Sequence, residues 1–288
     1  MSEFNRFEFC DSYTKILSEV WAKQSCSAVL ATDGLKLNAA NGHELLVPIY
    51  SVQGMAEYSR NEGFVKGAAS LEWDCVRFNY ERGRIFSIDV LDNAETQNLA
   101  FGQLANHFMK TQAIPEADAF TFSNLCSTVE PVEATITTGA AALSAIREAV
   151  NKMDNDEVPE YDRYLFVSPE IKAMIDDMDT YKSKAVTSRF TQIIAVPRGR
   201  FMNSFDFYDG TSEGQEAGGF APADGASPIN FLAVYKHGII SYMKHAVTKV
   251  ITPELNQEAD AWKYAYRASG YCGIPDAYLG SVYANIKG

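Results

Sequence analysis

The chain has 288 residues, of which 47% are hydrophobic and 22% are charged. This composition is typical of a globular protein with one elaborate domain or two packed ones, and it excludes bulk disorder. Its uncharged runs are too short or too polar for the roughly 20 apolar residues of a membrane-spanning helix. The net charge of −12 argues against a protein that grips nucleic acid, because neutralising phosphates requires clustered lysine and arginine.

The first 43 residues are expected to form an extended arm. Asp11 or Ser12 can cap a helix whose apolar positions end at Trp21, and residues 31–43 are polar and rich in glycine and asparagine. The acidic residues at the start are the reverse of the basic region of a signal peptide, so the sequence predicts a cytoplasmic chain.

A long β-ribbon is predicted next, because strand-like runs occupy residues 44–52, 68–80 and 84–91. Within the second run, Leu71 and Trp73 share one face, whereas Val76 and Phe78 share the other. This phase slip predicts a bulge or a strong twist. A two-stranded ribbon is marginal in water by itself, so neighbouring subunits are expected to cover it.

A long interrupted helix should follow the ribbon. Asp92 or Asn93 can cap it, and Glu95 in the first turn suits the helix dipole. The apolar pattern reaches Gln112 and resumes after Pro115, which should restart or kink the helix.

From residue 136 the pattern alternates between helix and strand, which predicts a separate α/β unit. A helical stripe covers 138–153, strands are expected at 164–167, 190–196 and 231–235, and Ser168-Pro169 starts another helix. Residues 209–228 hold five glycines and two prolines and should form an exposed loop. Further strands are expected at 239–243, 247–252, 261–267 and 281–286.

No catalytic residue, cofactor site or metal site is predicted. The four histidines are far apart, and no phosphate-binding glycine loop or nucleophile elbow is present. The acidic clusters at 154–162 and 176–179 are interpreted as solvated helix ends. The cysteines have no metal-site or disulfide spacing, and all are expected to be buried apolar side chains: Cys10, Cys26, Cys75, Cys126 and Cys272.

Charged residues on the ribbon and at the base of the long helix are candidate interface residues. Exposed ion pairs contribute little within a monomer, but across an interface they can fix register. The candidates from this pattern are Tyr58, Arg60, Arg82, Arg84, Asp89, Asp92 and Glu95.

Several segments together resemble a known family: VPIYSVQGMAEYSRNEGFVKGAASLEWDCVRF from Val47, ERGRIFSIDVLDNAET from Glu81, IPEADAF from Ile114, LFVSPEI from Leu165 and NQEADAWKYAYR from Asn256. In this order they resemble the major capsid proteins of tailed bacteriophages, which have the Hong Kong 97-type fold. The sequence departs from the pattern at Asn79-Tyr80, where relatives often carry an acidic–basic pair, and at Thr121, where they carry arginine.

The resemblance implies an α+β fold with an N-terminal arm (1–43), an extended β-hairpin loop (44–90) and a peripheral domain with a long spine helix (91–135). An inserted axial domain (136–245) and C-terminal peripheral strands (246–288) complete it. Four more interface residues lie in its motifs: Glu116, Asp260, Trp262 and Arg267. Although some relatives cross-link through lysine, no cross-link is predicted at Lys66.

The function implied is that of a shell protein, not an enzyme. Copies would assemble as hexamers and pentamers into an icosahedral capsid that encloses double-stranded DNA without sequence-specific binding. The implied partners are the chain itself, a portal protein, and scaffolding and decoration proteins, and the implied location is the virion, assembled in the host cytoplasm. An encapsulin-like compartment shell and a cytoplasmic α/β enzyme with an unrecognised site are the alternatives.

Overall fold

The structure is a computed structural model that describes residues 24–32, 36–37, 44–61, 63–91, 104, 106–178 and 180–288. The helix expected within residues 12–21 and the helix cap at Asp92 lie outside these residues. The chain divides into two compact units: one consists of Met1–Thr32 and Tyr80–Gly288, and the other of Asp33–Asn79.

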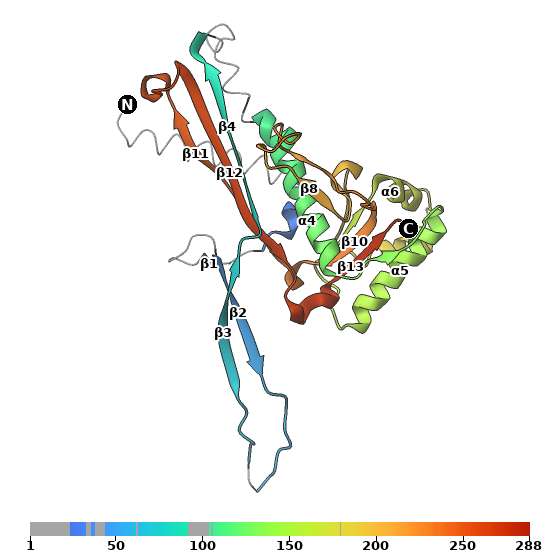
Figure 1. Ribbon diagram of the computed structural model, residues 1–288. Coiled ribbons are helices and arrows are strands. Elements are labelled where there is room, and N and C mark those ends of the chain that lie inside the picture. Colours follow the sequence, from blue (N-terminus) through green and yellow to red (C-terminus); the bar gives the residue numbers. More distant parts are fainter. Residues whose placement is uncertain are drawn as a thin grey trace. The chain divides into compact units, whose positions relative to one another are not determined.

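The smaller unit is an antiparallel ribbon (Figure 1). Strand β2 (Glu44–Val52) pairs with β3 (Ala69–Arg77), and the short β1 (Lys36–Leu37) pairs with β2. The register runs without a shift from Glu44 opposite Arg77 to Val52 opposite Ala69, so of the two predicted alternatives, a bulge or a strong twist, the bulge is wrong. The phase slip has another cause: apolar side chains occupy both faces of β3, and most of that strand is exposed.

The range 44–90 that is expected for the extended loop covers parts of both units, because the smaller unit ends at Asn79 and the larger unit resumes at Tyr80. Strand β4 (Tyr80–Asp89) is the edge of a sheet ordered β11-β12-β4 in the larger unit. Strand β11 spans Ile240–Ile251 and merges two predicted strands, and β12 spans Ala261–Gly273. The apolar side of β4 is buried by contact with β12 and the long helix, which explains why it leaves the ribbon.

The larger unit is built on a five-stranded sheet ordered β5-β13-β10-β6-β7. Its strands are β5 (Val132–Glu133), β6 (Arg163–Val167), β7 (Gln192–Ala195), β10 (Ile229–Tyr235) and β13 (Val282–Ile286). Every residue of β10 is buried. Leu232 and Val234 enter the core on one face, and Phe231 and Ala233 enter the core on the other, as the alternation of a strand requires.

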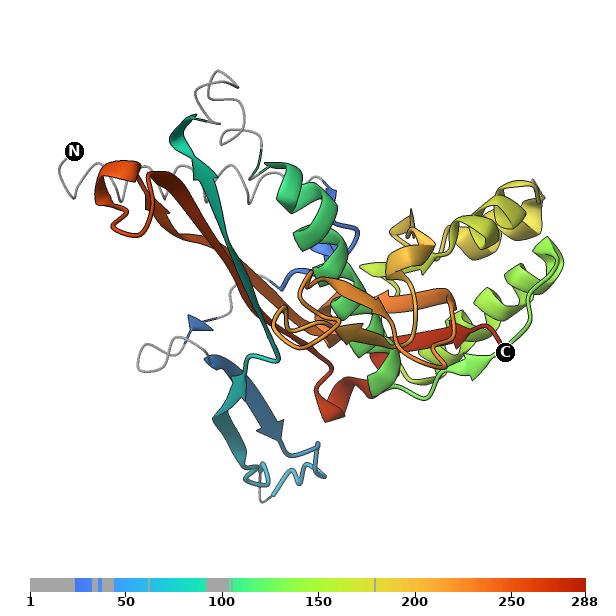
Figure 2. The same cartoon turned by 45° about the horizontal axis from the view of Figure 1, so that its top comes forward.

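Helices cover both faces of this sheet (Figure 2). Helix α4 (Ile114–Thr128) packs on one face, whereas α5 (Gly139–Asn155), α6 (Pro169–Asp176) and α7 (Tyr181–Thr187) pack on the other. The predicted start of α6 is confirmed: the Ser168 hydroxyl accepts a hydrogen bond from the Ile171 N–H at 3.4 Å. Thr138 caps α5 in the same way, by accepting from the Ala141 N–H at 3.2 Å.

Strand β13 and its partner β5 both belong to the five-stranded sheet. The expected peripheral range 246–288 includes β13, yet this strand pairs with β10 in the centre of the five-stranded sheet. Strand β5, expected in the peripheral range 91–135, pairs in parallel with β13. Both segments join the α/β sheet because β13 is buried on both faces and needs a neighbour on each edge.

The long helix is continuous across Pro115 within the described residues. A π-helical segment, Met109–Ala113, precedes α4, and the Ile114 N–H donates to the Met109 carbonyl five residues earlier. Proline has no N–H to donate and crowds the carbonyl four residues before it, so the wider turn accommodates Pro115 without a break.

Short elements complete the larger unit. Strands β8 (Phe205–Phe207) and β9 (Phe220–Pro222) form a hairpin, so the loop predicted at 209–228 is partly strand. Short 3-10 helices occupy Ala28–Leu30, Arg198–Arg200, Lys236–Gly238, Pro253–Leu255 and Asp276–Ser281. Among the described residues, no helix has the length and apolar character to cross a membrane.

Candidate functional site

Helix α4 is the centre of the larger unit and carries two buried carboxylates. One side of the helix packs on the five-stranded sheet, and the other packs on the sheet that contains β4 and β12. Glu116 is 8% exposed and Asp118 is 0% exposed. Residues two positions apart on a helix point about 200° apart, so the two carboxylates serve opposite sides of α4. A buried carboxylate requires a charged or hydrogen-bonding partner, and each has an arginine.

Glu116 joins α4 to β4. The Arg82 Nε lies 2.6 Å from Glu116 Oε1, and the Tyr80 hydroxyl donates to the same oxygen at 3.3 Å. The Tyr80 hydroxyl thus supplies a neutral donor beside the charged Arg82. The predicted interface residues Arg82 and Glu116 are therefore partners within one subunit.

The free energy of unfolding should depend on pH, because Tyr80 and Tyr266 are buried beside this cluster. Burial, followed by the charge of Glu116, raises the Tyr80 pKa well above its ordinary value of 10.0, and burial raises the Tyr266 pKa too. Because the pKa of each tyrosine is higher in the folded state than in the unfolded state, its contribution to the free energy of unfolding is constant below about pH 10. That contribution is lost as the pH rises from there towards the folded-state pKa. We expect the free energy of unfolding in urea to fall above pH 10 by about 1.4 kcal/mol per pH unit for each tyrosine. The Tyr80→Phe variant should show a shallower fall, and equal slopes would contradict this assignment.

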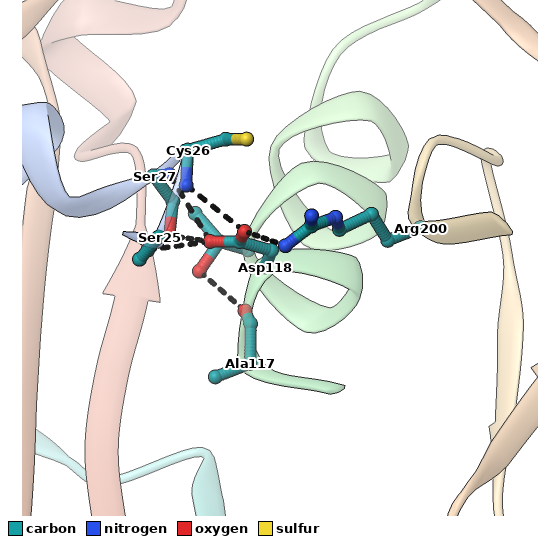
Figure 3. A network of polar contacts seen from close by, with 7 residues as sticks. Ser25, Cys26, Ser27, Ala117, Asp118 and Arg200 are labelled. Atoms are coloured by element: carbon teal, nitrogen blue, oxygen red, sulfur yellow. Dashed lines mark hydrogen bonds and ion pairs between the residues drawn. The ribbon is translucent and has the colours of Figure 1, made fainter. Parts of the chain in front are cut away.

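Asp118 joins α4 to the segment before the first 3-10 helix (Figure 3). Its Oδ1 accepts from the Ser25 hydroxyl at 2.6 Å, the Ser27 hydroxyl at 2.6 Å and the Ser27 N–H at 3.0 Å. Its Oδ2 accepts from the Cys26 N–H at 3.0 Å and from Arg200 Nη1 at 2.8 Å. Five donors thus converge on one fully buried carboxylate.

The sequence did not predict the Asp118 cluster. Residues 24–32 fall within the expected arm, yet they belong to the larger unit, and the side chain of Leu30 is 0% exposed in the core against α4. These residues pack in the larger unit because Leu30 is apolar and the serines satisfy a buried charge. The only local signal was the IPEADAF motif, which contains both carboxylates.

Arginines of β4 also contact the loop between β8 and β9. Arg82 Nη2 donates to the Tyr208 carbonyl at 2.7 Å and to the Gly219 carbonyl at 3.2 Å. Arg84 Nη2 donates to the Glu216 carbonyl at 3.2 Å. The structure therefore brings three predicted residues, Arg82, Arg84 and Glu116, to one end of α4.

The remaining predicted residues of the larger unit lie along the β4–β12 sheet. Arg267 forms an ion pair with Glu81. Asp89 Oδ1 accepts from the Leu91 N–H at 2.8 Å, and the Asp260 carbonyl accepts from the Val90 N–H at 3.1 Å. Trp262 is half-buried opposite Ile88 in the β12–β4 register. Asp92 and Glu95 lie outside the described residues.

Tyr58 and Arg60 lie in the ribbon unit, in the segment between β2 and β3, and both are exposed. The Tyr58 ring packs on Phe64 with centroids 4.8 Å apart. The ribbon unit exposes an unusual number of large apolar side chains: Tyr50, Val52, Met55, Tyr58, Phe64, Val65, Leu71 and Trp73, with Met55 and Phe64 at 105% and 88% exposure. A surface of this kind is typical of a protein–protein interface.

The described residues offer no cluster of three or more candidate metal ligands. The Cys126 and Cys272 side chains are buried, which confirms the prediction for these two, and burial raises the pKa of each thiol to about 12. The prediction is wrong for Cys75, which is exposed on β3 because that strand has no buried face.

No protein-family model matches the sequence, and no curated protein matches it either. Solved structures do match. The capsid structure of Staphylococcus phage Andhra aligns with a TM-score of 0.55 at 10% identity, covering 90% of this chain and 83% of that one. The capsid structure of cyanophage P-SCSP1u aligns with a TM-score of 0.53 at 12% identity, over 90% and 86% of the two chains. A virus-like particle from Pyrococcus furiosus aligns with a TM-score of 0.54 at 10% identity, over 96% and 99%.

These alignments cover most of both chains. Because the sequence identities are only 10–12%, they show a shared fold and nothing more. The order of elements in the two units, with a ribbon before a long helix and an α/β sheet after it, agrees with the expectation from the sequence motifs. The chain has the α+β fold of tailed-phage major capsid proteins, the Hong Kong 97-type fold.

Proposed function

We propose that the chain is a major capsid protein, whose copies assemble as hexamers and pentamers into a closed icosahedral shell. The observation that carries this proposal is the ribbon unit, which exposes Leu71 and Trp73 on one face of β3 and further apolar side chains in the segment between β2 and β3. A monomer gains nothing from that exposure, whereas a neighbouring copy would bury it. The capsid fold supplies the geometry in which one chain can close a shell by repeating its contacts.

The shell would enclose phage double-stranded DNA without reading its sequence. With 37 acidic and 25 basic residues, the chain is poor in the positive charge that tight binding to phosphates requires. DNA that must enter and leave the shell would move more easily past an inner surface that binds phosphates weakly. A portal protein, a scaffolding protein and decoration proteins are the partners that this function implies, the location would be the virion, and no catalytic activity is proposed.

Electron microscopy of the expressed full-length chain tests the proposal. We expect closed particles of uniform size under conditions that favour assembly, with hexameric and pentameric units resolved on their surface. A chain that stays monomeric under every assembly condition, with its ribbon resistant to proteases, would contradict the proposal.

A compartment loaded with protein is the second candidate. The virus-like particle from Pyrococcus furiosus matches over 99% of its own chain, so the same fold and length serve a particle that is not described as a phage. The contents of particles purified from the native source distinguish the two functions. Double-stranded DNA inside supports the phage capsid, and a packaged enzyme inside supports the compartment.

A further inference from the structure

The loop between β8 and β9, residues 208–219, is compact without help from the rest of the chain. Its ends are joined by the Tyr208 N–H, which donates to the Gly219 carbonyl at 3.0 Å. Asp209 Oδ1 accepts from the Thr211 N–H at 2.8 Å and from the Ser212 N–H at 2.9 Å. The Ser212 hydroxyl, which donates to Asp209 Oδ2 at 2.5 Å, together with these two N–H groups holds the Asp209 pKa well below its ordinary value, so the turn keeps its charged acceptor through mildly acidic conditions.

Hydrogen bonds from two arginines fasten this loop to β4. Arg82 binds the carbonyls at both ends of the loop while its Nε binds Glu116, so one guanidinium joins β4, α4 and the loop. Arg84 binds the Glu216 carbonyl. No residue between 208 and 219 is buried, and therefore no apolar side chain anchors the loop in a core.

Two glycines let the loop backbone approach Arg84. A Cβ added at Gly210 would lie 3.0 Å from Arg84 Nη1, and one added at Gly218 would lie 2.8 Å from it. Both residues have positive φ, at +75° and +67°. Gly214 also has positive φ, but a Cβ there would meet nothing within 4 Å. The loop backbone therefore approaches Arg84 closely at Gly210 and Gly218, but not at Gly214.

A cleft of about 360 Å³ separates the loop from the β4 sheet and the start of α4. The loop forms one wall. Three aromatic rings in edge-to-face contact line the opposite side: Phe86 lies 4.9 Å from Phe108, and Phe108 lies 5.4 Å from Tyr266, centroid to centroid. The volume lies within the range of small-ligand or side-chain binding sites.

We propose that residues 208–219 form a releasable strap, which Arg82 and Arg84 close over β4 and whose opening exposes the aromatic wall of the cleft. With the strap closed, β4, α4 and the β8–β9 hairpin move together. With the strap open, the hairpin keeps the contacts that its strands make with α4. In one of these, the ring centroids of Phe207 and Phe120 lie 6.1 Å apart. The inference concerns the isolated subunit and holds whichever particle the chain forms.

Cleavage by a glutamate-specific protease tests the strap, because Glu213 and Glu216 lie in it and the exposed Glu254 provides a reference site outside it. The Arg82→Lys variant keeps a positive charge beside Glu116 but loses the planar fork that reaches two carbonyls. Arg84→Gln removes the contact with Glu216. We expect each variant to speed strap cleavage about tenfold relative to cleavage after Glu254, since hydrogen bonds from charged groups stabilise by that much or more.

The matched control is Arg198→Gln, because Arg198 pairs with Glu170 at 2.6 Å away from the strap, and it should leave the ratio unchanged. Circular dichroism and the thermal midpoint establish that each variant is folded, and if Arg82→Lys fails, the exposed Arg84→Gln carries the test. Fluorescence of the apolar dye ANS should rise with strap cleavage. An unchanged cleavage ratio in Arg84→Gln would overturn the strap, and faster cleavage without dye binding would overturn exposure of the aromatic wall.

Discussion

Replacing Asp118 with alanine is expected to lower the free energy of unfolding of the larger unit by about 3–5 kcal/mol. The substitution removes a fully buried carboxylate and leaves Arg200 and the donors of residues 25–27 without their acceptor. Unsatisfied buried donors cost free energy because water cannot replace the lost partner. Urea unfolding followed by circular dichroism measures the change.

Two further variants sharpen this test. Asp118→Asn keeps the size of the side chain and one acceptor oxygen, so its loss should be smaller than that of alanine. Asp176→Ala removes an exposed carboxylate that lies 3.0 Å from Lys172, and exposed pairs of this kind contribute about 0.2–1 kcal/mol at most. If Asp118→Ala were as mild as Asp176→Ala, the five-donor cluster would not stabilise the fold.

Replacing Trp73 with glutamate is expected to abolish particle formation without unfolding the chain. Trp73 is 50% exposed on β3, and its neighbour on the same face, Leu71, is 49% exposed opposite Tyr50. A tryptophan in the centre of an interface typically contributes 2 kcal/mol or more, and a shell multiplies that contribution over every copy. A buried unpaired carboxylate in its place adds a penalty of its own. Sedimentation and microscopy measure assembly.

Ser70→Glu is the matched control for Trp73→Glu. It adds the same charge one strand position away from Leu71, on the face of β3 that already carries Glu72 and Asp74. We expect Ser70→Glu to assemble and to retain the thermal midpoint of the wild type. If the Trp73→Glu variant forms normal particles, the ribbon does not supply the contact between copies that we propose, even though the fold itself would be unaffected.

The sequence predicted those elements whose signals are local. The Ser168-Pro169 helix start and the helical stripe of α5 depend on residues within one or two turns, and the structure has both. The ordered motifs predicted the fold class, because the motifs lie in different helices and strands and their order follows the order of those elements. Conversely, the phase of β3 predicted a bulge or a strong twist, and the bulge does not exist, since period-two patterns presuppose one buried face.

What the sequence could not predict depends on partners far away along the chain. Ser27 and Asp118 are 91 positions apart, and nothing near Ser27 marks it as a donor to a buried charge. Arg82 looked like an exposed interface residue because its neighbours are charged, yet its Nε binds a carboxylate that is 8% exposed. Charge alone does not tell a pair within one subunit from a pair between subunits, which is why the interface residues stay a prediction.

The position of β13 affects the order in which the molecule can be completed during synthesis. Strand β10 ends at Tyr235, but its neighbour β13 begins only at Val282, after β11 and β12 have been made. Until residue 286 has left the ribosome, one edge of β10 is unpaired and the core beside α4 lacks three of its side chains, Val282, Ala284 and Ile286. An open apolar edge attracts other strands, so a nascent chain at this stage is exposed to wrong pairing.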